Sequence, residues 1–304
     1  MRSANPRDYY HPQDKKALES LKQIPGFSAA LKAFMKVFNE NMIHGLNMSN
    51  KIRITDQQLP NLYRLLPPVC EKLGIKEPEF YLEMDPVANA YTYGDSIIAI
   101  TVTSGLVDLM NEEEIQVVLA HECGHIACHH VLYHTMARTV LSAGSAIPGM
   151  DLLTTALQFA LFHWERCSEF SCDRAAAIYM EDPGPVARVM SLLASGSEKI
   201  SSQINMELYM EQAREYQHLL DRSNWDKALQ YMALMNQSHP FLSVRAAEIN
   251  DWCKTKKYAD IIAYMYEEKK GNTCPGCGAS VQEEWMFCKQ CGSKLKEKNG
   301  YVTF

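Results

Sequence analysis

The feature that most constrains this chain is the segment His121–His125, which reads His-Glu-Cys-Gly-His. Asn111 followed by three glutamates is an N-cap with an acidic first turn, so we expect a helix from Asn111 to about Ala137. A spacing of four residues places both imidazoles on one helix face, where two ring nitrogens can bind one zinc ion. Glu122 lies beside them. The segment therefore predicts a helix built around a metal site.

A catalytic zinc site takes three protein ligands and leaves one position for water, so a further His, Glu or Asp is required. A second helix is predicted from Trp164 to Met180, and it carries Glu169 and Asp173 one turn apart. Glu169 is the candidate third ligand. Asp173 shares its helix face and can accept the N–H of a ligand histidine, which fixes the tautomer. The alternative, a polar helix face rich in histidine, is less favoured because the capped helix and the carboxylate pair both suit a zinc site.

Several separated motifs resemble the HtpX-like and CAAX-prenyl-protease-type gluzincin metallopeptidases, over roughly residues 78–249. The matching motifs are Asn89-Ala90-Tyr91 with Gly94, His121-Glu122-x-x-His125, Glu169-x-x-x-Asp173 with Arg174-Ala175-Ala176, and His239-Pro240 followed by Arg245. The resemblance implies that His121, His125 and Glu169 bind zinc. It also implies that Glu122 is the general base and that Asp173 orients a ligand. The expected activity is a zinc-dependent endopeptidase acting on protein or peptide substrates, with protein quality control as a candidate role.

Four positions have weaker support. Asn89 and Ala90 resemble the edge strand on which family members bind an extended substrate, although an ordinary turn-flanked strand explains them as well. His239, a candidate catalytic residue, has three interpretations: an oxyanion donor, a fourth zinc ligand in a resting state, or a cap before Pro240. Arg245 is either a substrate contact or a structural ion-pair partner.

Three more histidines, His129, His130 and His134, continue along the predicted helix. Residues beyond a catalytic turn usually serve packing or face solvent, so we do not expect these three to bind metal.

A second metal site is predicted near the C-terminus. Its four candidate ligands form two Cys-x-x-Cys pairs, each followed by glycine: Cys274, Cys277, Cys288 and Cys291. Such pairs offer four thiolates to one tetrahedral zinc, and a redox dithiol is the less favoured alternative. The segment resembles short zinc-ribbon modules. We therefore expect two zinc ions, one catalytic and one structural, and the ribbon is a candidate docking module for a protein partner.

The predicted fold class is α+β and predominantly helical: a zincin-like (gluzincin) catalytic domain with a small edge-strand sheet, plus the ribbon. Helical periodicity covers Pro12 to Leu73 and resumes from Val186 to Glu268. Short β segments are expected at Phe80–Leu82, Ala90–Tyr93 and Ile97–Val102. The expected domains are a helical N-terminal layer (1–77), the catalytic domain (78–268) and the ribbon (272–296).

Charge and composition limit the partners and the location. The net charge of −6 argues against nucleic acid as a partner. The N-terminal residues lack the apolar core of a signal peptide, so we expect a cytoplasmic protein with reduced cysteines. The apolar stretch Thr139–His163 is interrupted by glycine and proline, and we expect it to pack on the protein. Peripheral association with the inner face of a membrane is the alternative.

The competing function is a latent or non-catalytic adaptor that keeps the zinc fold and binds other proteins. Glu122 argues against the adaptor, because hydrolysis requires this residue and zinc binding does not. The sequence assigns no specificity pocket.

Overall fold

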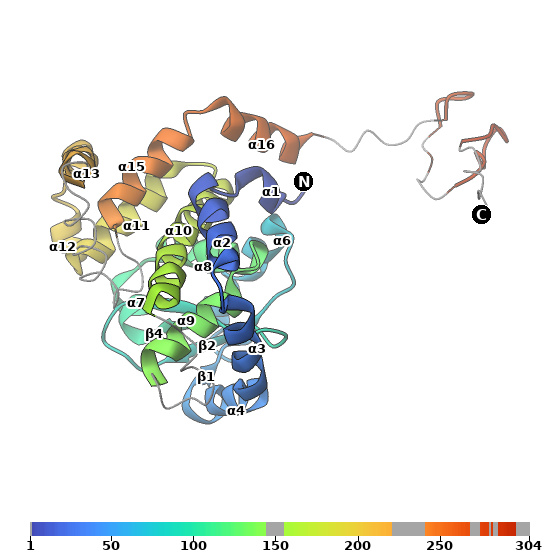
Figure 1. Cartoon of the computed structure of the whole chain (residues 1–304). Helices are drawn as coiled ribbons and strands as arrows, with labels where there is room; N and C mark the ends of the chain where they lie inside the picture. The colour runs from blue at the N-terminus through green and yellow to red at the C-terminus, as the bar shows by residue number, and fades with distance from the viewer. Residues whose placement is uncertain are drawn as a thin grey trace. The chain divides into compact units, whose positions relative to one another are not determined.

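The computed structural model describes residues 2–143, 155–220, 241–267, 274–279, 281 and 285–295. The chain divides into two compact units. The larger unit is Ser3–Ile262, and the smaller comprises the first two residues with Ala263–Phe304. The fold is predominantly helical with one small sheet, which confirms the predicted fold class (Figure 1).

The sheet has four strands in the order β1-β2-β4-β3. Their bounds are β1 Ile52–Arg53, β2 Glu79–Glu83, β3 Ala90–Tyr93 and β4 Ala99–Thr103. Strands β2 and β4 are parallel, whereas β1 pairs with β2 and β3 pairs with β4 in antiparallel register. Every residue of β4 is buried, as expected of an inner strand. Strand β3 is at one edge of the sheet. Strand β1 was not predicted, because its two exposed residues show no alternation.

Three helices follow the sheet and carry most of the predicted site: α8 Glu112–Ala127, α9 Val131–Ala143 and α10 Thr155–Met180. Helix α8 begins after the predicted N-cap Asn111, whose side chain and backbone form a capping box with Glu114. The prediction of one helix continuing to Ala137 is wrong. The chain turns between α8 and α9, where His129 adopts a left-handed φ of 58°. Helix α10 begins before the predicted Trp164.

The N-terminal region is helical, and its second and third helices pack on α9 and α10. Their bounds are α1 Pro6–Tyr9, α2 Pro12–Gln23, α3 Phe27–Val37, α4 Glu40–Asn50, α5 Pro60–Tyr63 and α6 Pro67–Leu73. Helix α2 lies along α10 (Figure 1). Leu21 of α2 and Phe34 of α3 share an apolar core with Met136 of α9 and Trp164 of α10. The helices that precede the sheet therefore belong to the same packed unit as the predicted metal-site helices.

The remaining helices are α7 Ser104–Leu109, α11 Pro183–Ser195, α12 Glu198–Ser201, α13 Met206–Leu220, α15 Leu242–Trp252 and α16 Lys256–Tyr266. Helix α11 packs against α8, α10 and α15. Residues 144–154 of the apolar stretch Thr139–His163 lie outside the described residues, as do the predicted helix break near Ser223 and His239. In the part of the chain that the structure describes, no helix has the length and apolar character needed to cross a membrane.

Candidate active site

The carboxylate of Glu169 on α10 lies against both histidines of α8. Its Oε2 is 3.4 Å from His121 Nε2, and its Oε1 is 3.3 Å from His125 Nε2. All three side chains are buried. A tetrahedral zinc with bonds of about 2.0–2.1 Å holds neighbouring donors about 3.3 Å apart. The spacing of these donor atoms and their chemistry therefore fit a zinc ion.

Gly124 allows this close approach of α8 and α10. A Cβ atom at Gly124 would lie 2.9 Å from both Ala175 Cβ and Cys172 Cα, closer than real Cβ contacts come. Ala175 and Ala176, which follow Asp173 by two and three residues, are fully buried. Small side chains at this crossing let the backbones approach until Glu169 reaches the histidines.

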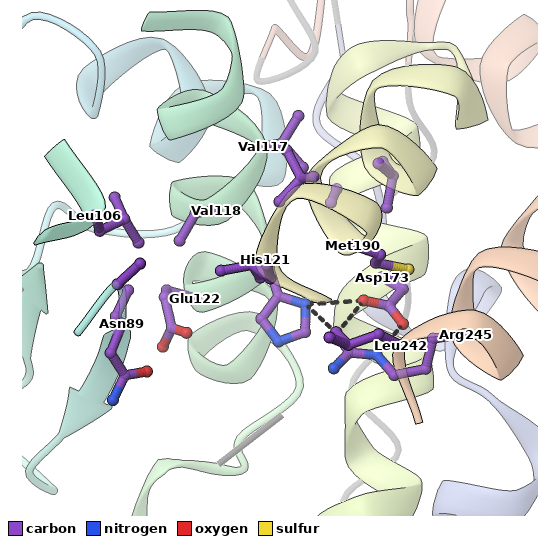
Figure 2. Close-up of a pocket in the computed structure, with 16 residues that line it drawn as sticks. Asn89, Leu106, Val117, Val118, His121, Glu122, Asp173, Met190, Leu242 and Arg245 are labelled. Atoms are coloured by element: carbon purple, nitrogen blue, oxygen red, sulfur yellow. Dashed lines mark hydrogen bonds and ion pairs between the residues drawn. The ribbon is translucent and has the colours of Figure 1, made fainter. Parts of the chain in front are cut away.

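Asp173 and Arg245 hold His121. The Nδ1 of His121 lies 3.0 Å from Asp173 Oδ1, and Arg245 donates to both Asp173 oxygens, from Nε at 2.7 Å and Nη2 at 2.6 Å. Figure 2 shows the His121 ring between Glu122 on one side and the Asp173–Arg245 pair on the other. Burial would raise the pKa of Asp173, but Arg245 and His121 hold it below its ordinary value. The ionised carboxylate fixes the N–H of His121 on Nδ1 and turns Nε2 toward Glu169.

The two histidines differ in proton affinity. Burial lowers the pKa of His121, yet the carboxylates of Glu169 and Asp173 outweigh it and raise the pKa to about 9. For His125, burial and the neighbouring His134 lower the pKa to about 3. His125 is therefore a neutral imidazole, with one N–H, at neutral pH. His121 carries a second proton at neutral pH, because Glu169 and Asp173 stabilise the charged ring. A bound cation would displace that proton.

Glu122 is held by a residue that the sequence analysis missed. Thr92 of the edge strand β3 donates its hydroxyl to Glu122 Oε2 at 2.7 Å, and both side chains are buried. The contact joins the sheet to α8. The alternating pattern of β3 was the only sequence feature that indicated Thr92 is buried. Its contact with Glu122 could not be predicted from that pattern, because Glu122 lies 30 residues further along the chain.

An apolar cavity of about 320 Å³ opens beside Glu122 and His121. Its apolar walls come from helices α7, α8, α11 and α15 (Figure 2). They are formed by Leu106, Val117, Val118, Val186, Val189, Met190, Leu193 and Leu242. Asn89 and Ala90 line the side next to β3. The cavity is adjacent to the predicted general base and has the apolar lining of a side-chain pocket.

The remaining candidate residues differ in their burial and contacts. Arg245 lines the cavity but directs its guanidinium to Asp173, and Nη1 also lies 3.0 Å from Glu169 Oε2, so its contacts are those of an ion-pair partner. His130 and His134 are buried, whereas His129 is exposed. The expectation that these three side chains follow one helix is wrong, because the turn after α8 redirects the chain. His239 lies outside the described residues.

The four C-terminal cysteines come together in the smaller unit. Cys274 Sγ lies 3.4 Å from Cys291 Sγ, and Cys277 Sγ lies 3.8 Å from Cys288 Sγ. Zinc–sulfur bonds of about 2.3 Å in a tetrahedron separate sulfurs by about 3.8 Å. Gly278 and Gly292 have φ values of 72° and 76°, the left-handed backbone predicted for the turns around the sulfurs.

Trp285 packs against the cluster around Cys274 and Cys288, whereas Met286 and Phe287 are exposed.

Comparison with known proteins gives two family matches. The sequence model of peptidase family M48 matches residues 56–253, and a zinc-ribbon domain model matches residues 273–295. The chain is 33% identical over 261 residues to the plastoglobule-localized metallopeptidase 48 of Arabidopsis thaliana, covering 84% of this chain and 75% of the relative. It is 22% identical to a protease HtpX homolog of Campylobacter concisus, covering 73% and 84%. No solved structure matches the chain.

Proposed function

The chain belongs to peptidase family M48 and is a zinc-dependent protease, and we propose that it is an endopeptidase whose catalytic zinc is bound by His121, His125 and Glu169. The observation that carries this assignment is the Glu169 carboxylate, which lies 3.4 Å and 3.3 Å from the two Nε2 atoms. Zinc, when bound, lowers the pKa of a water molecule and polarises the peptide carbonyl.

The residues around the proposed zinc ligands transfer the proton or position the groups that act. Glu122 takes the proton of the attacking water and passes it to the leaving amine. Thr92 holds Glu122 in place through its 2.7 Å hydrogen bond. Asp173 and Arg245 orient His121, so Arg245 acts through a ligand rather than on substrate.

We assign substrate binding to β3 and the cavity. An extended peptide placed alongside β3 would pass Asn89 and Ala90 and present one side chain to the apolar cavity. A side chain the size of leucine, methionine or phenylalanine suits the lining. Main-chain recognition requires an extended segment and tolerates many sequences, so unfolded proteins are the proposed substrates and protein quality control is the proposed role.

We further propose two zinc ions per chain, with the second held by Cys274, Cys277, Cys288 and Cys291. The exposed Met286 and Phe287 are the proposed docking contacts of this ribbon for a protein partner. The adaptor alternative is not favoured, because Glu122 is buried beside the ligands and aligned by Thr92.

For location we propose the cytoplasm, with peripheral membrane association as the alternative. Cell fractionation distinguishes them: a chain that sediments with membranes and leaves them only in high salt would be peripheral.

The central experiment compares the wild type with Glu122→Gln. The control is Glu113→Gln, the same substitution on the exposed first turn of α8. Zinc content and cleavage of casein, an unfolded protein, are measured for each. We expect about two zinc ions in all three proteins. Cleavage should be lost in Glu122→Gln alone, and mass spectrometry of the products should show large apolar residues beside the cleaved bonds.

Cleavage by Glu122→Gln at the wild-type rate would overturn the assignment of the base. Zinc bound without activity in the wild type would contradict an active endopeptidase, and His239→Ala would then test whether His239 blocks the site.

A further inference from the structure

The second ring nitrogen of His125 faces another histidine. His125 Nδ1 lies 3.3 Å from His130 Nδ1, and His130 Nε2 lies 3.0 Å from Asp14 Oδ2. Asp14 and His130 are both completely buried. The three residues come from different elements: Asp14 from α2, His125 from α8, and His130 from the turn before α9. A continuous path of polar contacts thus runs from the N-terminal helix to a proposed zinc ligand.

Asp14 is held as an acceptor. Trp164 Nε1 donates to its Oδ1 at 3.0 Å, and the Ser171 hydroxyl donates to its Oδ2 at 2.5 Å. Burial raises the pKa of Asp14, but His130 and these donors outweigh it and lower the pKa below the ordinary value. An ionised carboxylate can only accept hydrogen bonds. The proton of the contact between Asp14 and His130 therefore sits on His130 Nε2.

This assignment fixes the tautomers along the path. With the proton of that contact on Nε2, Nδ1 is the His130 nitrogen placed to accept the N–H of His125 Nδ1, 3.3 Å away. The Nε2 lone pair of His125 is then directed toward Glu169, where a zinc ligand needs it. Two other groups contact His130: the Tyr10 hydroxyl, 3.1 Å from Nε2, and Cys172 Sγ, 3.7 Å from Nδ1.

We propose that Asp14 and His130 are positioning residues that orient His125 for zinc, so that helix α2 is part of the metal site. The inference rests on the proposed zinc ligands. It gives His125 the same kind of support that Asp173 gives His121 directly. Carboxylates behind a ligand histidine fix its ring and increase its basicity. Here the carboxylate acts through an intervening imidazole.

A second metal ion among His125, His130 and His134 is the competing explanation, since their donor atoms cluster. The contacts of His134 argue against it. Its Nε2 lies 2.8 Å from Ser168 Oγ, and its Nδ1 lies 3.2 Å from Glu165 Oε1. Both ring nitrogens of His134 thus contact side chains of α10, and His130 Nε2 contacts Asp14. These contacts compete with a second metal ion for the same nitrogens.

The test measures cobalt affinity of the full-length chain in chelator-buffered solution. Cobalt at the histidine–carboxylate site absorbs in the visible range, whereas the four-cysteine site adds thiolate charge-transfer bands and serves as an internal reference. The informative pair is His130→Gln and His130→Phe. Glutamine can accept from His125 and donate to Asp14, whereas phenylalanine keeps the ring volume and removes both hydrogen bonds.

We expect His130→Phe to weaken binding at the histidine site about 10- to 100-fold, and His130→Gln to weaken it less. Asp14→Asn should also weaken it, by about tenfold. The control is Leu21→Ala, which loosens the packing of α2 without touching the path. This control should lower the melting temperature and leave cobalt affinity unchanged.

Three results would overturn the proposal: unchanged affinity in His130→Phe and Asp14→Asn, tighter binding by His130→Phe than by His130→Gln, or a loss in Leu21→Ala equal to that in Asp14→Asn. A wild type that binds cobalt only at the cysteines would instead overturn the proposed catalytic site itself.

Discussion

Two carboxylates one turn apart on α10 have different neighbours. Asp173 receives two hydrogen bonds from Arg245, which pairs its charge and directs its remaining interaction to His121 Nδ1. Glu169 faces the Nε2 atoms of both histidines. In the proposed site, a carboxylate thus serves as a metal ligand at one position and as support for a ligand at the other.

Thr92 provides a residue-scale prediction. Thr92→Val keeps the shape of the side chain but removes the donor to Glu122. A hydrogen bond to a charged group contributes about 1.5–3 kcal/mol, so we expect kcat to fall at least about tenfold, with KM and zinc content little changed. Steady-state kinetics on a short peptide measures this.

The matched control is Thr101→Val on the neighbouring strand β4. Thr101 is equally buried, but its hydroxyl accepts a hydrogen bond from Lys51. If both valine variants lost the same activity, the effect would come from the sheet as a whole rather than from Glu122.

At the scale of elements, the turn after α8 shapes the site as much as the helix does. The turn consists of Cys128, His129 and His130. Because none of them is glycine or proline, no residue indicated a break, and a continuous helix was predicted. A left-handed residue other than glycine costs about 1 kcal/mol. The turn brings His130 back to 3.3 Å from His125, a contact that a straight helix would not make.

Gly124 gives the element-scale prediction. Gly124→Ala would place a methyl group 2.9 Å from the α10 backbone at Cys172, so α8 and α10 must separate. We expect a loss of about 1–3 kcal/mol in stability. Zinc affinity should fall as well, because Glu169 moves away from the histidines. Thermal unfolding and chelator competition measure the two effects.

Gly45→Ala in α4 is the matched control, since a Cβ atom there meets nothing within 4 Å. This substitution should be neutral or slightly stabilising, because alanine restricts the unfolded chain. Equal losses in both variants would show that the helix crossing is not the cause.

At the scale of the whole molecule, local patterns were predictable and long-range contacts were not. His121 and His125 are four residues apart on one capped helix, so their shared face follows from helix geometry. The two Cys-x-x-Cys pairs were likewise predictable as a metal site, because their spacing is local in the sequence. The contacts of Asp14 with His130, and of Thr92 with Glu122, join residues far apart in sequence, and no local periodicity encodes such pairs.

The division into two units predicts that the zinc sites are separable. All the groups assigned to catalysis lie in Ser3–Ile262, whereas the cysteines lie beyond it. Cys288→Ser combined with Cys291→Ser should therefore lower zinc content from about two ions to about one and leave short-peptide cleavage unchanged. Cys253→Ser, at the end of α15, controls for loss of a thiol and should retain both ions. Loss of peptide cleavage in the double variant would show that the ribbon supports the catalytic unit. A selective loss of casein cleavage would instead identify the ribbon as the surface that captures protein substrates.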